Sequence, residues 1–361
     1  MKKNYSTIDI LKGLAILAVV GIHFLDKTFP YLSESQKLWG FWLDQGLRFS
    51  VPLFVALSGY GLAQKYQSQT LNYRSFLKRR AIKLLPAYFL GSAIAYGSII
   101  FFRVWPGYRE SYPWWQIIFL GRADYHLYFV PMIFQLYLLF PLFWQATQKF
   151  SLKFLLLTWG FQLGWFELAG HYLQPFKNGF WSDQWQYLLG LTWVGYFVLG
   201  IFLATQKILS WKLLKLLGAG ALLLGLIFSG LSSWQLFVRF GDTLQAVRFN
   251  RPVIFLYASG FIVFSLSLGA QFFKPSWLWR PIEILGRWSY EIYLIHTLPL
   301  RFLIDVKHFS PLYYPEIQYL LILLFSSSFA GLIHWLSSLK LMLFKNSFSQ
   351  TPTKVKSTQN L

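Results

Sequence analysis

Apolar runs of about 17–24 residues recur along the chain, the length that a helix needs to cross a hydrocarbon core of about 30 Å. Short polar stretches separate them. The pattern predicts an all-α polytopic membrane protein with about ten transmembrane helices. The ten predicted segments are 8–25, 46–64, 82–102, 126–146, 152–168, 186–205, 212–229, 253–271, 284–303 and 317–339.

The charges between these segments predict how the chain crosses the membrane. If the N-terminus is cytoplasmic, every inner loop is basic and most of the 13 Asp and Glu residues lie in outer loops. This is the distribution that the positive-inside rule describes. We therefore expect both termini in the cytoplasm, a membrane domain over residues 1–345, and a polar, disordered cytoplasmic tail over residues 346–361.

Composition excludes several classes of function. The chain is 55% hydrophobic and only 13% charged, whereas soluble domains are about 25% charged. The net charge of +20 follows mostly from the basic inner loops, so we expect no nucleic-acid partner. The chain has no Cys, which excludes disulfides, thiolate metal sites and a Cys nucleophile. His171, His308 and His334 show no metal-ligand spacing, and we expect no metal.

The first predicted segment carries ionisable residues at membrane depth. Lys12 and His23 are eleven residues apart, which places them on one helix face about 16 Å apart along the axis. Such residues usually face a protein interior or a cavity because they are costly in lipid. The alternative is a Lys12 that reaches the interface and a His23 with a purely structural role.

A cluster of four cations opens the third predicted segment. Lys78, Arg79, Arg80 and Lys83 have the chemistry that a multiply phosphorylated cytosolic molecule needs, because guanidinium groups bind phosphate bidentately. The alternative is membrane anchoring on anionic lipid. In the second segment, Ser58 is placed to donate either to a substrate or to its own i−4 carbonyl.

Four further residues are candidates for the opposite side of the membrane. Asp124 and His126 precede the fourth segment, and an Asp near a His can orient the imidazole or hold a sugar hydroxyl. Glu291 and His296 lie within the ninth segment about 140° apart around the helix, so each needs a partner elsewhere. The alternatives are an ordinary interfacial pair and simple interhelical hydrogen bonds.

In this order, these stretches resemble the acyltransferase-3 family of integral membrane acyltransferases. The resemblance covers nearly the whole membrane portion, and no single motif carries it alone. The matching stretches are Ile8-Asp-Ile-Leu-Lys-Gly-Leu-Ala through His23, Pro52-Leu-Phe-Val-Ala-Leu-Ser-Gly-Tyr60, Arg79-Arg80 through Pro86 and Tyr88, His126-Leu-Tyr-Phe, and Leu285-Gly-Arg-Trp-Ser-Tyr through His296. Three positions depart from the family's common residues: Lys12 and Lys83 replace Arg, and Tyr128 replaces Trp.

The resemblance implies an acyl-coenzyme A co-substrate, most often acetyl-CoA, and an acceptor hydroxyl on a cell-surface glycan or related molecule. It implies that the coenzyme binds Arg79 and Arg80, with Lys83 and Ser58 close by. It further implies that Lys12 and His23 serve catalysis, His23 as general base or as acyl carrier. Asp124, His126, Glu291 and His296 would then shape the acceptor side.

The family also implies a setting for the protein. We expect a multi-pass protein of a bacterial plasma membrane. Some family members carry a fused extracytoplasmic hydrolase-like domain, which we do not expect here, so the acyl group would pass directly to the acceptor or to a separate partner protein. The rival hypothesis is a transporter or flippase for a glycan or lipid-linked precursor, which would not consume acyl-CoA.

Overall fold

A computed structural model of the chain describes residues 5–102, 113–171, 184–273 and 277–349, and these residues form helices and connecting loops without strands. The predicted all-α fold is confirmed. Most of the predicted apolar segments coincide with long helices. The long helices are α1 (Tyr5–Thr28), α2 (Glu34–Leu47), α3 (Ser50–Tyr66), α4 (Tyr73–Phe102), α7 (Phe129–Phe150), α8 (Leu152–His171), α10 (Val194–Thr205), α11 (Trp211–Phe240), α13 (Pro252–Phe272) and α17 (Pro315–Ser349).

Short helices connect these elements, and several of them form the surroundings of the candidate site. They are η1 (Phe29–Tyr31), α6 (Trp114–Phe119), α9 (Gln184–Leu188), η3 (Gly190–Trp193), α12 (Thr243–Ala246), α14 (Arg280–Arg287), α15 (Ser289–Ile295), α16 (Thr297–Arg301) and η4 (Phe302–Val306).

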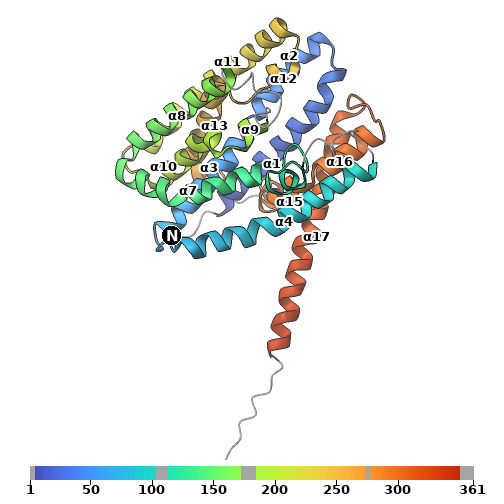
Figure 1. Ribbon diagram of the computed structural model, residues 1–361. Helices are drawn as coiled ribbons and strands as arrows, with labels where there is room; N and C mark the ends of the chain where they lie inside the picture. The colour runs from blue at the N-terminus through green and yellow to red at the C-terminus, as the bar shows by residue number, and fades with distance from the viewer. Residues whose placement is uncertain (1–4, 103–112, 172–183, 274–276, 350–361) are drawn as a thin grey trace, which may run out of the picture.

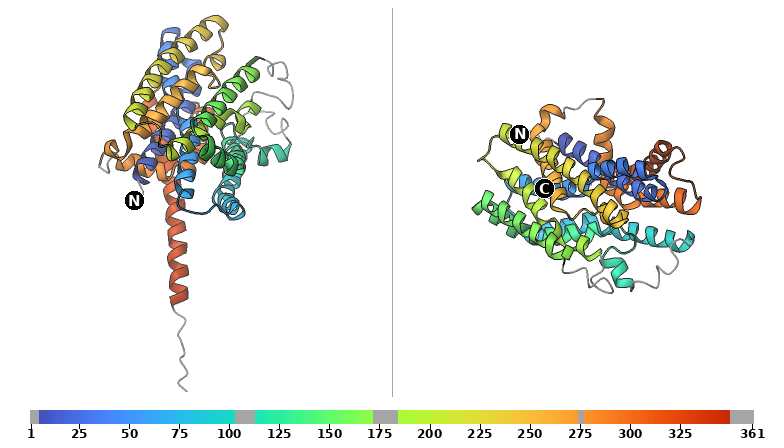
Figure 2. Two further views of the ribbon diagram at one scale, coloured as in Figure 1. Left: turned by 90° about the vertical axis from the view of Figure 1, so that its left-hand side faces the viewer. Right: turned by 90° about the horizontal axis from the view of Figure 1, so that it is seen from above.

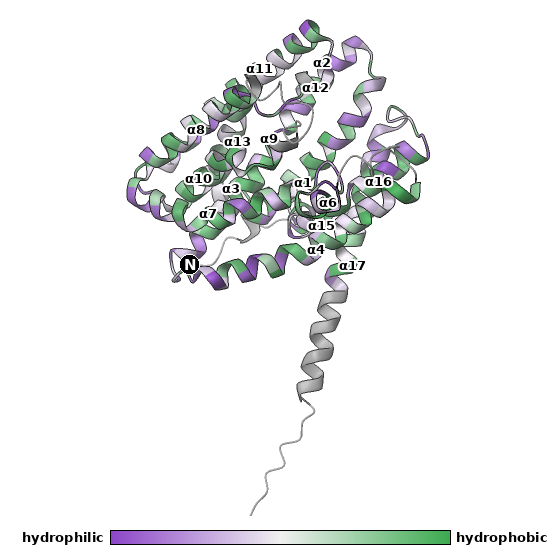
Figure 3. Ribbon diagram, viewed as in Figure 1, coloured by the Kyte–Doolittle hydropathy of each residue, from purple (hydrophilic) through white to green (hydrophobic). Residues whose placement is uncertain are grey.

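Seven helical segments among the described residues are long and apolar enough to cross a membrane, and the shorter apolar stretch Gly190–Thr205 accompanies them. Their outward faces carry exposed large side chains, for example Leu216, Leu223 and Leu224 of α11. Figure 3 shows hydrophobic residues along the lengths of the helices and hydrophilic residues mainly near their ends. These features are typical of helices in contact with lipid. The exact number of spans and the orientation of the termini stay predictions.

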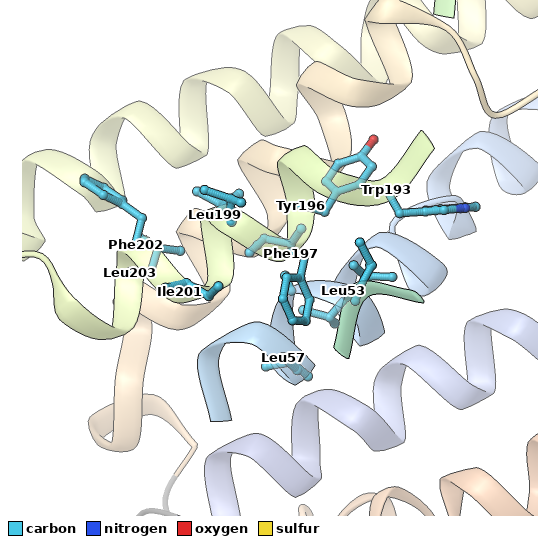
Figure 4. Close-up of a cluster of buried hydrophobic side chains, with 14 of the residues drawn as sticks. Leu53, Leu57, Trp193, Tyr196, Phe197, Leu199, Ile201, Phe202 and Leu203 are labelled. Atoms are coloured by element: carbon cyan, nitrogen blue, oxygen red, sulfur yellow. The ribbon is translucent and has the colours of Figure 1, made fainter. Parts of the chain in front are cut away.

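The interior is organised around α10. All residues from Val194 to Leu203 are buried, as expected for a helix that is hydrophobic all round. Figure 4 shows Phe197 and neighbouring α10 side chains packed against Leu53 and Leu57 of α3. Gly59 permits this close approach, because a Cβ there would clash with the carbonyl oxygen of Phe197.

The start of α1 and the end of α17 lie at the same end of the bundle, and the last part of α17 extends beyond the other helices there (Figures 1 and 2). Residues 346–349 of the expected tail belong to α17, and its remainder, 350–361, lies outside the described residues.

The predicted ninth segment, 284–303, is not one continuous helix. The structure divides it among α14, α15, α16 and η4. Pro299 contributes to this division because it has no N–H to donate to the carbonyl of Ile295. A second interruption lies at Trp288, whose backbone (φ −95°, ψ 6°) departs from helical values. The broken helix places His296 and Arg301 in the interior.

Candidate active site

Three imidazole rings from distant parts of the chain meet inside the bundle. His23 comes from α1, His126 from the loop before α7, and His296 from the junction of α15 and α16. The ring centroids of His23 and His296 are 5.1 Å apart, those of His126 and His296 4.8 Å, and those of His23 and His126 6.1 Å. We call these three residues the histidine cluster. Of the four residues predicted on the acceptor side, the structure brings His126 and His296 into contact with the predicted catalytic His23. Asp124 lies beside His126, whereas Glu291 lies elsewhere.

The loop that carries His126 is held by its own turn and by α15. The chain reverses at Gly121, whose φ of +70° is in the left-handed region and whose position leaves no room for a Cβ beside the carbonyl of Leu127. The hydroxyl of Tyr293 donates a hydrogen bond to the carbonyl oxygen of His126. Tyr293 also packs its ring against His126 at 5.1 Å. The position of His126 therefore depends on α15, which leads directly to His296.

Asp124 lies beside the cluster and is completely buried. Its Oδ2 accepts hydrogen bonds from Arg301 Nη2 at 2.6 Å and Thr297 Oγ1 at 2.8 Å. Arg301 also donates from Nη1 to Ser98 Oγ of α4 at 2.5 Å. The Nδ1 of His126 is 3.9 Å from the same carboxylate oxygen. Asp124 thus joins the loop, α16 and α4 around the histidines.

Different interactions shift the pKa values of Asp124 and His126, the two residues of this loop. Burial alone would raise the pKa of Asp124, but interactions with His126 and the charge of Arg301 outweigh it and hold this pKa below its usual value. Burial lowers the pKa of His126, against the opposing influence of Asp124. Asp124 is therefore ionised at neutral pH, and burial disfavours the protonated form of His126.

Arg301, Thr297 and Ser98 were not predicted as site residues. Arg301 follows His296 by five residues in the apolar ninth segment. A cation within a membrane segment is a signal for a functional site, so the sequence does carry a signal for Arg301. Thr297 and Ser98 carry no signal that would distinguish them from other hydroxyl residues in membrane helices.

Several buried nitrogens of the histidine cluster have no hydrogen-bond partner among the described residues. They are His23 Nδ1, both ring nitrogens of His126, and His296 Nε2. Leaving a buried polar atom unpaired costs roughly 1–3 kcal/mol, and most buried polar atoms in native proteins are paired. Unpaired groups concentrated at one place are typical of a site that receives a ligand or a reacting group.

Two small pockets adjoin the cluster, and Tyr125 lines both. One is lined by Lys27, Tyr125, Thr297, Leu300, Arg301 and Asp305, and the other by Leu120, Gly121, Arg122, Tyr125, Tyr128 and Leu188. The rings of Tyr125 and His23 are 4.9 Å apart. Lys27 Nζ forms an ion pair with Asp305 at 2.7 Å across the first pocket.

The predicted coenzyme-binding residues gather near the opposite end of α1. The guanidinium of Arg80 lies 5.2 Å from the ring centroid of Tyr137, and the Tyr137 hydroxyl donates to Ser58 Oγ at 3.4 Å. Arg79 donates to the hydroxyl of Tyr66 at 3.2 Å. Arg80, Ser58 and Tyr137 thus belong to one group that joins α3, α4 and α7.

Two lysines lie near Arg79 and Arg80. We call Lys12, Arg79, Arg80 and Lys83 together the cation cluster. Lys83 interacts electrostatically with Arg80 and Lys12. Lys12 forms an ion pair with Asp9 at 3.2 Å. Helix α14 packs closely on α1 here, because a Cβ on Gly286 would clash with the carbonyl oxygen of Asp9. Lys12 and His23 are separated by about 16 Å along α1, at about 1.5 Å per residue.

Glu291 lies with the cation cluster and not with the histidines. Its Oε1 is 3.5 Å from His334 Nε2 of α17, and it also interacts electrostatically with Lys83. Glu291 and His296 were expected to find partners on other elements, and the structure gives Glu291 a partner in α17. Its assignment to the acceptor side stays a prediction.

A second buried polar cluster was not predicted. Asp44 accepts hydrogen bonds from Arg48 Nε at 2.9 Å and Nη2 at 2.7 Å, and from Gln45 Nε2 at 2.8 Å. Arg251 donates to Gln45 Oε1 at 2.7 Å and also to Ser232 and Ser233. We call Asp44, Gln45, Arg48 and Arg251 the arginine network. Burial and the nearby Arg48 lower the pKa of Arg251 to about 10, so it stays charged at neutral pH.

Within the described part of the chain, no group of three or more His, Cys, Asp or Glu residues has the arrangement needed to hold a metal ion. The histidine cluster is included in this finding. Its imidazoles are in contact through their rings, and an imidazole can transfer a proton or act as a nucleophile.

Comparison with known proteins adds to this geometry. The profile of the acyltransferase-3 family, described as an acyltransferase domain, matches residues 5–336. The chain belongs to the acyltransferase-3 family. The family resemblance predicted from the motifs is thus confirmed, and the chain is a multi-pass membrane acyltransferase.

A relative in Bacillus subtilis (strain 168) agrees with the family assignment. The protein described as "Putative membrane-bound acyltransferase YfiQ" is 24% identical over 315 residues, which cover 80% of this chain and 79% of the relative. No solved structure matches the chain. The matched region of the acyltransferase-3 family includes all residues of the histidine and cation clusters.

Proposed function

We propose that this acyltransferase moves an acyl group, most often acetyl, from cytosolic acyl-CoA to a hydroxyl of a cell-surface glycan or related acceptor. The observation that carries the proposal is the distance between the cation cluster and the histidine cluster, each of which has one member on α1. Lys12 and His23 are about 16 Å apart along this helix. Buried nitrogens of the histidine cluster are unpaired among the described residues. A donor with a phosphorylated head and a long arm that ends in a thioester matches this separation.

The cation cluster supports the donor side of the proposal. Arg80 forms no ion pair among the described residues, and Tyr137 and Phe76 lie under its guanidinium. Its hydrogen-bond donors are thus open to the phosphates of the coenzyme. Arg79 binds beside it, and Lys83 and Lys12 add positive charge. Ser58, hydrogen-bonded to Tyr137, lies along the way from the phosphates toward the thioester.

The histidine cluster supports the chemical step. His23 acts as general base on the acceptor hydroxyl or as a transient acyl carrier. Asp124, held by Arg301 and Thr297, fixes the loop that carries His126. The acceptor, or the end of a partner protein that takes the acyl group, approaches on the side of Tyr125, whose ring contacts that of His23. We propose a bacterial plasma membrane as the location.

The test is release of coenzyme A from acetyl-CoA by the full chain in nanodiscs, with crude exopolysaccharide extract as acceptor. We expect release that depends on both the extract and His23. His308→Asn is the matched control, because His308 is exposed and its φ of 55° suits Asn.

If several acyl-CoAs give no release although the protein is folded, the proposed donor is wrong. A transport assay with a lipid-linked glycan then tests the rival hypothesis of a flippase.

A further inference from the structure

The backbone determines which nitrogen of His296 carries the proton. Nδ1 lies 2.8 Å from the carbonyl oxygen of Tyr293. A carbonyl oxygen only accepts hydrogen bonds, so Nδ1 must be the protonated nitrogen of the neutral ring. The lone pair therefore resides on Nε2, which is buried and has no hydrogen-bond partner among the described residues.

Burial favours the uncharged form of this ring. His296 is fully buried, and its ring neighbours are His23, His126 and Tyr293. Asp124, which accepts hydrogen bonds from Arg301 and Thr297, also interacts electrostatically with His296. An imidazole that is uncharged, with one fixed proton and one open lone pair, has the arrangement of a general base.

In His23 and His126, unlike His296, no backbone carbonyl among the described residues determines which ring nitrogen carries the proton. The Nδ1 of His23 is 3.7 Å from Asp26 Oδ2, too far for a hydrogen bond, and its side chain is 16% exposed. His126 has no hydrogen-bond partner at either ring nitrogen among the described residues. Neither ring has its tautomer fixed by a backbone group. His23 is instead the more accessible ring, and its stacking on His296 at 28° between planes brings the two into contact.

We propose that the two rings divide the reaction, with His23 as acyl carrier and His296 Nε2 as general base for the acceptor hydroxyl. The inference rests on the proposed function and deepens it. First, a ring nitrogen of His23 attacks the thioester carbonyl carbon and the carbon–sulfur bond breaks. The thiolate takes the ring proton of His23, which leaves neutral N-acyl-imidazole and free coenzyme A.

In the second step, the acceptor oxygen attacks the acyl carbon and the bond between carbon and the His23 nitrogen breaks. His296 Nε2 takes the hydroxyl proton and then passes it to the departing nitrogen of His23. Both rings return to their neutral forms, and the sum is acyl-CoA plus alcohol giving ester plus coenzyme A. Contact between the rings makes this proton return short.

The experiment separates the two steps in the full chain in nanodiscs. His296→Asn keeps an N–H that can bind the Tyr293 carbonyl and removes the basic nitrogen. With acetyl-CoA alone, we expect this variant to release a stoichiometric burst of coenzyme A like the wild type. With exopolysaccharide extract, we expect its turnover to fall by about 10²–10⁴-fold.

Hydroxylamine sharpens the test, because this strong nucleophile attacks an acyl-imidazole without a general base. We expect it to restore turnover in His296→Asn and to leave His23→Ala inactive. His296→Gln repeats the measurement if the first variant does not fold, and His308→Asn is the control for both.

Three results would overturn the inference while the proposed function stands. In the first, both His296 variants transfer the acyl group at the wild-type rate, and in the second, folded His296 variants lose the burst and the transfer equally. In the third, the wild type transfers the acyl group but shows no burst with acetyl-CoA alone. If the wild type releases no coenzyme A from any acyl-CoA, the proposed function itself fails.

Discussion

The histidine cluster and the arginine network are both buried and polar, but they differ in how their hydrogen bonds are satisfied. In the arginine network, both oxygens of Asp44 accept hydrogen bonds, and Arg251 donates to Gln45, Ser232 and Ser233. In the histidine cluster, buried imidazole nitrogens lack partners among the described residues. A satisfied network specifies a fold, whereas an unsatisfied one retains groups for another molecule.

This difference matters for how each cluster responds to mutation. Removing one member of a satisfied charged network leaves its partners buried without compensation and costs stability. Removing an unpaired imidazole leaves no such partner behind. We therefore expect the two clusters to separate activity from stability, and the predictions below test that separation, beginning with the largest effect.

The largest expected effect is on activity. His23→Asn should lower acyl transfer by about 10²–10⁴-fold, because it removes the ring that reacts or moves the proton. The unfolding midpoint in detergent should change little, since Nδ1 of His23 has no hydrogen bond among the described residues to lose. Parallel measurement of turnover and thermal unfolding checks both parts. A large loss of stability with activity kept would reverse the roles that we assign to the clusters.

The second prediction concerns the arginine network. Asp44→Asn removes the carboxylate that both Arg48 and Gln45 bind, and it leaves two buried guanidinium groups without a counter-charge. We expect a destabilisation of about 3–5 kcal/mol and nearly normal turnover per folded molecule. Denaturant unfolding with a folded-fraction-corrected assay measures this. Loss of turnover in the folded fraction would show that the network also serves catalysis.

The sequence allowed the elements to be predicted better than their meeting points. Long apolar runs predict helices because length and hydrophobicity alone decide that a span forms. The break at Pro299 is visible in the sequence, but proline is tolerated in membrane helices, so 284–303 was expected to be continuous. Its division determines where His296 and Arg301 point.

The candidate site shows the same limit. His23, His126 and His296 were each identified from charge at membrane depth or from motif resemblance, but residue spacing within one helix says nothing about contacts with another. Asp44 and Arg48 have the i,i+4 spacing of a helical ion pair, which is a readable signal. Arg251 lies far away in the sequence, and it meets them only because α11 packs on both α13 and α2.

A third prediction extends the comparison to the cation cluster, where Arg80 has no ion pair among the described residues. Arg80→Met should raise the KM for acetyl-CoA by about tenfold or more, since a hydrogen bond to a charged group contributes about 1.5–3 kcal/mol. The burst with saturating acetyl-CoA should be kept. Arg80→Lys keeps the charge but loses the guanidinium fork, so it should restore binding only in part. An unchanged KM in Arg80→Met would remove this residue from the donor site.

The fourth prediction uses the pH dependence of folding. Burial lowers the pKa of His126 below 6.5, so above that pH the ring is neutral in both the folded and the unfolded chain. As the pH falls below 6.5, only the unfolded chain takes up the proton, and stability falls by at most about 1.4 kcal/mol per pH unit. Asp124, whose pKa is lowered, contributes only at much lower pH. In His126→Asn the slope just below 6.5 should be smaller, and a slope equal to that of the wild type would contradict the prediction.

The smallest effect should come from a charged pair with one exposed partner. Arg287 Nη2 donates to Glu283 four residues earlier in α14, and the Arg287 side chain is 59% exposed whereas that of Glu283 is 15% exposed. When the pair is broken, water solvates the Arg287 guanidinium and Asp9 remains 3.8 Å from its Nε, so Glu283→Gln should cost less than about 1 kcal/mol. Comparison with Asp44→Asn in the same unfolding assay then tests the effect of burial on the arginine that is left behind, because both substitutions remove a carboxylate from an i,i+4 pair with arginine. If the two substitutions cost the same, burial is not the reason for the stability that we assign to the arginine network.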